Sequence, residues 1–177
     1  PWLPGYEGSA PVRVGNAAST QFQLDVYGEV ADSLYCASRA GIPPDENAWR
    51  VKRAMTEFVA SVWKDPDEGI WEVRGPRRQF THSKVMAWVA VDRAVKAVEQ
   101  FGQEGPVKRW RRLRAAIHAD VCKHGFDPGL GAFVQYYGSD LLDASLLLMP
   151  LVKFIAPTDP RSLGTLDAIG EELVSDS

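Results

Sequence analysis

Apolar residues recur at three- and four-residue intervals along most of this 177-residue chain, and strict two-residue alternation is almost absent. This spacing places the apolar side chains on one face of a helix, so it predicts an all-α fold. The expected helices span residues 17–40, 45–65, 83–102, 106–124, 141–152 and 160–173.

Local signals set the predicted helix ends. Gly41 and Pro43 stop the first helix, and Asp45 is placed to cap the second, which runs to the Asp65–Pro66 break. Pro106 suits the first turn of the fourth helix. The segment 141–152 is apolar nearly all round, which indicates a buried helix.

The fourth helix is strongly amphipathic. Its apolar stripe consists of Trp110, Leu113, Ile117 and Val121, and basic residues cover much of the remainder. We interpret the basic residues as a solvated outer face rather than a nucleic-acid surface, because the whole chain has a net charge of -3. The more apolar third and fifth helices are expected to be inner helices.

The connections between the predicted helices alternate in length. Short links follow the first, third and fifth helices, whereas residues 1–16, 65–81 and 125–139 form long segments rich in Gly, Pro and aromatic residues. In antiparallel helix pairs such long loops emerge at one end. The pattern therefore predicts an array of αα-hairpins with a decorated rim, and such an array can close into a toroid.

Composition excludes several classes of protein. A net charge of -3 and 45% hydrophobic residues are typical of one globular unit. They do not indicate a protein that binds nucleic acid or a membrane surface. Cys36 and Cys122 lie in helical patterns, which predicts buried thiols and a reducing, cytoplasmic compartment. Because His82, His118 and His124 have no metal-ligand spacing, we expect no metal and no cofactor.

The run from Asp67 to Glu72 places a carboxylate directly after an indole inside a loop rich in Gly and Pro. An apolar wall and partial desolvation raise the pKa of a carboxyl group, and an enzyme that protonates a leaving oxygen needs that shift. Glu72 is therefore the candidate general acid. The alternative is an ordinary exposed acid beside a surface Trp71.

The three long loops together carry the residue types of a sugar site. Aromatic rings pack on the apolar C–H faces of a pyranose, and charged or amide groups bind its hydroxyls. The predicted substrate-binding residues are Trp2, Tyr6, Arg13, Asn16, Trp71, Arg74, His82, Lys84, Gln135 and Tyr136, with Arg77, Arg78 and Phe133 on the same rim. The alternative is that these aromatics only pin the loops to the helix ends, and that His82 only caps a helix.

Six sequence blocks occur in order along nearly the whole chain. They are WLPGYEGS at 2–9, PVRVGNAA at 11–18, QLDVYGEV at 23–30, GIWE at 69–72, FTHSKVMAW at 80–88 and LDAS at 142–145. With these blocks the chain resembles the family 15 glycoside hydrolases, which include glucoamylases, glucodextranases and one group of trehalases. The resemblance implies an (α/α)6 toroid, of which residues 1–177 would form about half, as a single partial catalytic domain.

The resemblance also implies chemical roles. In that family the glutamate after the tryptophan of the GIWE block is the general acid, and Glu72 occupies this position. The reaction is inverting, and the family's catalytic base lies in the second half of the toroid, so it has no counterpart here. Asp25, Glu29, Asp140 and Asp143 are further carboxylates, and we assign none of them as the base. Asp25 and Glu29 are expected to meet sugar hydroxyls or solvent.

The resulting hypothesis is a fragment of an inverting α-glucoside hydrolase that acts on trehalose or α-linked glucans. The start of the chain at Pro1 lacks an initiator Met and indicates a fragment, which alone would be inactive. Half a toroid would expose apolar surface, so a second copy or the missing half-domain is an expected partner. The alternative is a non-catalytic helical-repeat module that binds carbohydrate or protein.

Overall fold

The computed structural model describes residues 5–10, 20–42, 45–73 and 75–173 of the chain. Its α-helices are α1 (Asp25–Arg39), α2 (Glu46–Val62), α3 (Thr81–Phe101), α4 (Val107–His124) and α5 (Pro160–Glu172). Two 3-10 helices, η1 (Tyr6–Gly8) and η3 (Ala144–Leu148), and a short antiparallel pair, β1 (Phe126–Asp127) and β2 (Ala132–Phe133), complete the described elements. The prediction of an all-α fold is confirmed.

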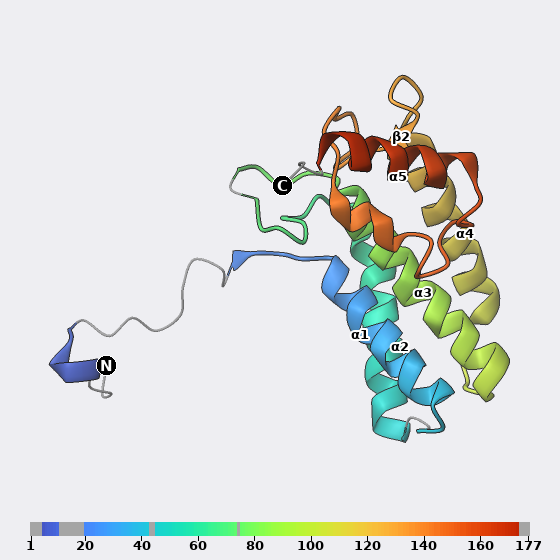
Figure 1. The fold of residues 1–177 in the computed structure, drawn as a ribbon. Helices are drawn as coiled ribbons and strands as arrows, with labels where there is room; N and C mark the ends of the chain where they lie inside the picture. The colour runs from blue at the N-terminus through green and yellow to red at the C-terminus, as the bar shows by residue number, and fades with distance from the viewer. Residues whose placement is uncertain (1–4, 11–19, 43–44, 74, 174–177) are drawn as a thin grey trace.

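Helix α3 is the centre of the molecule. It packs against α1, α2 and α4, and every residue from Thr81 to Val95 is buried. Figure 1 shows α3 between the α1–α2 pair and α4, with α5 lying crosswise near β2. Burying a charged side chain is costly unless the charge is paired, so the charged residues of this helix need partners.

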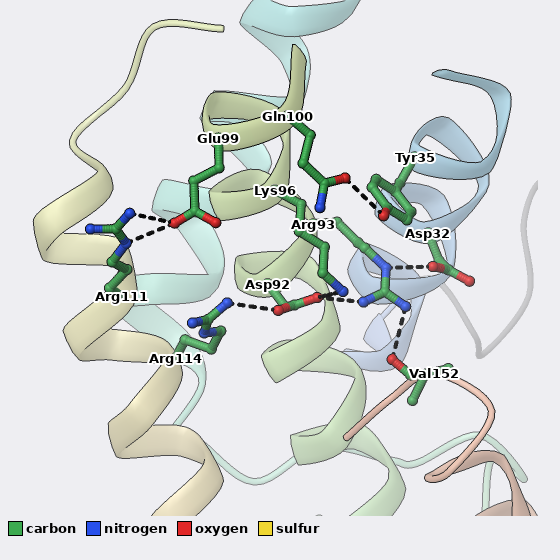
Figure 2. A network of polar contacts seen from close by, with 10 residues as sticks. All are labelled: Asp32, Tyr35, Asp92, Arg93, Lys96, Glu99, Gln100, Arg111, Arg114 and Val152. Atoms are coloured by element: carbon green, nitrogen blue, oxygen red, sulfur yellow. Dashed lines mark hydrogen bonds and ion pairs between the residues drawn. The ribbon is translucent and has the colours of Figure 1, made fainter. Parts of the chain in front are cut away.

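Two adjacent charged residues of α3 meet this demand through a network of ion pairs, drawn in Figure 2. The carboxylate of Asp92 accepts hydrogen bonds from Arg93 and, at 2.9 Å, from Arg114 on α4, and it pairs with Lys96 at 2.8 Å. The Arg93 guanidinium also donates to Asp32 on α1 at 2.6 Å and to the Val152 carbonyl at 2.9 Å. The network therefore ties α1, α4 and the turns after η3 to the central helix.

Several predicted helix ends are confirmed. Asp45 caps α2 by accepting a hydrogen bond from the Ala48 N–H at 2.7 Å, and Asp159 caps α5 through the Arg161 N–H at 2.9 Å. Gly102 ends α3 in the left-handed conformation at φ 68°. In each case a residue type that commonly caps helices lies next to the helix, so the local sequence was sufficient to locate that helix end.

The first helix is shorter than predicted. Residues 21–24 are not helical, and α1 begins at Asp25. The N–H groups of Phe22 and Leu24 donate to the carboxylates of Glu68 and Asp67, at 2.7 and 3.0 Å. These bonds to a distant loop take the place of a further helical turn, which spacing alone could not reveal. Residues 17–19 lie outside the described part of the chain.

The predicted helix at 141–152 is wrong. This segment contains only the short 3-10 helix η3 followed by turns. Pro150 has no N–H, so a continuous helix through this position would lack one backbone hydrogen bond. Leu151 is 71% exposed, so the apolar run does not form a buried cylinder, and the expectation that it is an inner helix fails with it.

The predicted apolar stripe of α4 is confirmed, whereas the predicted burial of the two cysteines is not. Trp110, Ile117 and Val121 are buried and Leu113 packs against the core. Cys36 is exposed and Cys122 is half-buried, so the prediction of two buried thiols is wrong. No described helix is long and apolar enough to cross a membrane.

Large apolar side chains remain exposed on the described surface, as expected for part of a larger domain. Leu163 and Leu166 of α5 are 48% and 52% exposed, and Val26 of α1 is 46% exposed. Which partner covers them stays a prediction. The closed toroid also stays a prediction, because these helices describe only an array.

Helices α1 and α3 approach so closely at Gly28 that no side chain fits there. A Cβ atom at this position would lie 2.3 Å from the Met86 carbonyl oxygen. We predict that Gly28→Ala lowers the free energy of unfolding of the full-length protein by roughly 1–3 kcal/mol, because the helices must separate.

The matched control is Gly170→Ala in α5, where an added Cβ meets nothing within 4 Å. This substitution is expected to be neutral or to stabilise the protein by up to about 1 kcal/mol through helix propensity. Chemical denaturation of both variants checks the prediction, and equal effects would show that α1 and α3 are not in close contact.

Candidate active site

The GIWE block lies in the connection between α2 and α3, which we call the Trp71 loop and define as residues 67–78. The loop is closed at its base by an antiparallel bridge, in which Asp67 and Arg78 exchange two backbone hydrogen bonds of 3.0 Å each. Trp71 and Glu72 lie in the part of the loop between the two bridged residues.

One side of the Trp71 loop is anchored to the segment that precedes α1. The buried Asp67 carboxylate accepts a hydrogen bond from the Leu24 N–H, and the Glu68 carboxylate accepts one from the Phe22 N–H. The Gln23 amide donates to the Gly69 carbonyl at 3.3 Å. Burial raises the pKa of Asp67, and the bond from Leu24 opposes that rise. The loop therefore does not move freely at this side.

Among the described residues of the loop, Gly69, Glu72 and Gly75 have positive φ angles. Gly69 has φ 70°, and a Cβ there would lie 2.7 Å from the Phe80 ring, so glycine is required for both conformation and space. Glu72 has φ 48°, which is uncommon for a residue with a side chain. Its N–H donates to the Gly69 carbonyl at 3.2 Å, and this turn maintains the strained conformation.

The side chains of Trp71 and Glu72 are both exposed, Trp71 to 58%. The indole N–H of Trp71 donates to both carboxylate oxygens of Asp143, at 3.0 and 3.1 Å. The predicted apolar wall and desolvation around Glu72 are therefore not formed by the described residues. An apolar pocket of about 230 Å³ lies elsewhere, between η3 and α5, and its lining includes neither Trp71 nor Glu72.

His82 and Lys84 lie in the first turn of α3, and both are buried. The Lys84 ammonium donates to the carbonyls of Trp63 and Asp65 at the end of α2, at 2.6 Å each. Burial lowers the pKa of Lys84 to about 8. In this structure Lys84 joins two helices, and its substrate contact, like that of His82, stays a prediction.

The other predicted substrate-binding residues are distributed unevenly. Gln135 and Tyr136 lie beside the residues that connect the Trp71 loop to α3, because the Gln135 carbonyl accepts from the Thr81 N–H and Tyr136 forms a β-bridge with Phe80. The second and third long loops thus meet, as predicted. Tyr6 is 85% exposed in η1. Trp2, Arg13, Asn16 and Arg74 lie outside the described residues.

Two neighbouring rim residues have structural contacts. The Arg78 guanidinium lies over the Tyr136 ring, 4.4 Å from its centroid. Phe133 is 1% exposed in the core, so its predicted place on the rim is wrong. The strand pair β1–β2 turns its side chain inward, and a strand of two residues gives no alternation that could have been detected in the sequence.

Two carboxylates have contacts that the sequence analysis did not foresee. Asp25 is 4% exposed at the start of α1, so the expectation that it meets sugar hydroxyls or solvent is wrong, and burial raises its pKa. Asp143 is 5% exposed, accepts from the Ser145 N–H at 2.8 Å and binds Trp71. An aspartate before a short helix is a recognisable cap, but its bond to Trp71 joins residues 72 positions apart in the sequence.

Among the described residues, no group of three or more His, Cys, Asp or Glu could hold a metal ion.

The sequence profile described as glycosyl hydrolases family 15 matches residues 1–177 of the chain. The chain belongs to this family. It is 44% identical over 174 residues to a trehalase of Mycobacterium tuberculosis, with 98% of this chain and 25% of that protein covered. It is 41% identical over 172 residues to a trehalase of Thermoplasma acidophilum, with 97% of this chain and 30% of that protein covered.

The family 15 chain therefore spans about a quarter to a third of the length of these curated relatives. A solved structure of a glycosidase in complex with glucose has a TM-score of 0.77 at 21% identity, covering 98% of this chain and 48% of the other. This likeness confirms the all-α fold. The six-hairpin toroid and the site residues stay predictions for the family 15 chain.

The buried His82 generates a testable dependence of stability on pH. Neither ring nitrogen has a hydrogen-bond partner among the described residues, and burial lowers the pKa to about 4, with the charge of Asp143 opposing that effect. Between about pH 6.5 and 4 the unfolded chain binds a proton that the folded chain does not. The free energy of unfolding must therefore fall as the pH falls through this window, by up to about 3 kcal/mol.

We predict that His82→Gln removes this contribution. The Tm of the wild-type protein relative to the variant should decrease from pH 7 to pH 4 in thermal scans of the full-length protein. His124→Gln is the matched control, because His124 is exposed. A Tm difference between wild type and His82→Gln that is the same at every pH would contradict the prediction.

Proposed function

We propose that the full-length protein is an inverting α-glucoside hydrolase in which Glu72 is the general acid. The observation that carries the proposal is that Glu72 is an exposed carboxyl group on a loop whose neighbouring carboxyl groups are engaged in structural hydrogen bonds. Asp67, Glu68 and Asp143 each accept an N–H from another part of the chain, whereas the Glu72 side chain stays accessible to a substrate. Its place after Trp71 corresponds to the family's acid.

In the proposed reaction Glu72 protonates the glycosidic oxygen as its bond to the anomeric carbon breaks. A second carboxylate, roughly 6.5–9.5 Å away, activates a water molecule on the opposite face of the sugar. We assign that base to a part of the protein outside these residues. A general acid needs apolar surroundings to keep its proton, and the bound sugar together with the rest of the domain would provide them at Glu72.

Trehalose is the substrate that we favour. The relatives of M. tuberculosis and T. acidophilum are both named trehalases, at 44% and 41% identity. The exposed indole face of Trp71 offers a surface for a glucosyl ring, and the side chains of Gln135 and Tyr136 lie on the neighbouring loop. Glucans with α-1,4 or α-1,6 links present the same α-glucosyl unit and are the alternative substrates.

The proposal predicts the result of Glu72→Gln in the full-length protein. Glucose release should fall by roughly a thousandfold or more, which is about 4 kcal/mol of barrier, while the fold is retained. The assay compares trehalose, maltose and isomaltose, and the substrate hydrolysed fastest by the wild type identifies the preferred link. Glu171→Gln, an exposed glutamate of α5, is the matched control and should keep full activity.

Unchanged turnover in Glu72→Gln would show that another group is the acid. Absence of turnover on every sugar, with binding retained, would favour the non-catalytic binding module. Inversion has its own readout, because proton NMR should detect β-glucose as the first product from maltose or isomaltose. An α-anomer formed first would contradict the inverting mechanism.

A further inference from the structure

We propose that Asp143 is a positioning residue that holds the Trp71 loop so that Glu72 faces the substrate. This inference rests on the proposed role of Glu72 as general acid. Asp143 itself lies under the rim, 5% exposed, and acts through the indole of Trp71 rather than by touching the sugar.

The contact between these residues is a shared hydrogen bond to a charged acceptor. The Trp71 Nε1–H donates to both carboxylate oxygens of Asp143, at 3.0 and 3.1 Å. Hydrogen bonds to a carboxylate are stronger than neutral ones. Since Nε1 lies off the Cβ–Cγ axis, a bond at this atom restricts both side-chain torsions of Trp71.

Asp143 is suited to this task because its own position is fixed. Its Oδ1 atom accepts the Ser145 N–H at 2.8 Å as the cap of η3. The nearby His82 is buried, and burial keeps its imidazole neutral at neutral pH. At neutral pH no imidazolium therefore competes with Trp71 for the Asp143 carboxylate.

Fixing Trp71 matters because Glu72 follows it in a strained turn. The segment 20–24 anchors the loop at Asp67 to Gly69, and the Glu72 N–H donates to the Gly69 carbonyl. Beyond this turn, the described contact of Trp71 with Asp143 ties the acid's neighbour to the start of η3. Without it, an indole that is 58% exposed could donate to water, and the direction of Glu72 would vary at little cost in stability.

The test uses Trp71→Phe, Asp143→Ala and the double variant in the full-length protein, with the substrate that the wild type hydrolyses fastest. Phenylalanine keeps an aromatic ring for sugar stacking, removes the N–H, and leaves the Asp143 cap of η3 intact. Each single variant should lower kcat by about 10- to 100-fold, with KM changed by less than about threefold. The double variant should be no slower than the slower single variant, because both changes break one contact.

Asp140→Ala is the matched control, because Asp140 is an exposed aspartate in the same segment. It should keep the wild-type kcat. Thermal scans establish that each variant is folded, and if Asp143→Ala does not fold, Trp71→Phe alone still decides the question.

A wild-type kcat in Trp71→Phe would overturn the inference. So would effects of the two single variants that multiply in the double variant, since Asp143 would then act independently of Trp71. Glu72→Gln separates the two proposals. If it abolishes turnover while Trp71→Phe does not change kcat, the acid assignment stands and the role of Asp143 is wrong; if it has no effect, the proposed function itself is wrong.

Discussion

Burial of α3 from Thr81 to Val95 is the constraint on which the rest of this structure depends. A buried helix that carries the charged residues Lys84, Asp92 and Arg93 is stable only where neighbouring elements supply partners for those charges. Lys84 donates to two carbonyls just after α2, those of Trp63 and Asp65. The two central charges, Asp92 and Arg93, pair with groups from α1, α4 and the turn after η3. The hydrogen bonds that pair the charged side chains of α3 therefore also fix where the loops of the rim begin.

The acidic residues on this rim divide into two groups by environment. Asp67, Glu68 and Asp143 accept backbone or indole N–H groups and hold the Trp71 loop on two sides. Glu72 differs because it is exposed, and its backbone is kept in an uncommon conformation by a bond to Gly69. Three carboxyl groups thus have structural contacts, and the proposed acid is a different one, although Asp67 and Glu68 lie only a few residues before it.

Much of the helical framework could be predicted from local pattern. Apolar spacing located α2, α3, α4 and α5, and Asp45 and Gly102 marked two of their ends. The two failures have different causes. Residues 21–24 and 141–152 carry helix-like spacing, but Asp67 and Glu68 bind the first segment, and Pro150 interrupts the second. Apolar spacing reports which side chains can be buried together, and it does not report which distant group will bind the backbone.

For the site, the sequence by itself determined the chemical groups and their order. Gly69, Trp71 and Glu72 in one short loop, and the family blocks along the chain, point to a glycosidase without any coordinates. Only the tertiary structure decided that Asp143 binds Trp71 and that Asp25 is buried. The physical reason is distance along the chain. Caps and turns form between residues a few positions apart, whereas a contact spanning 72 residues exists only after the buried α3 has brought the two loops to the same rim.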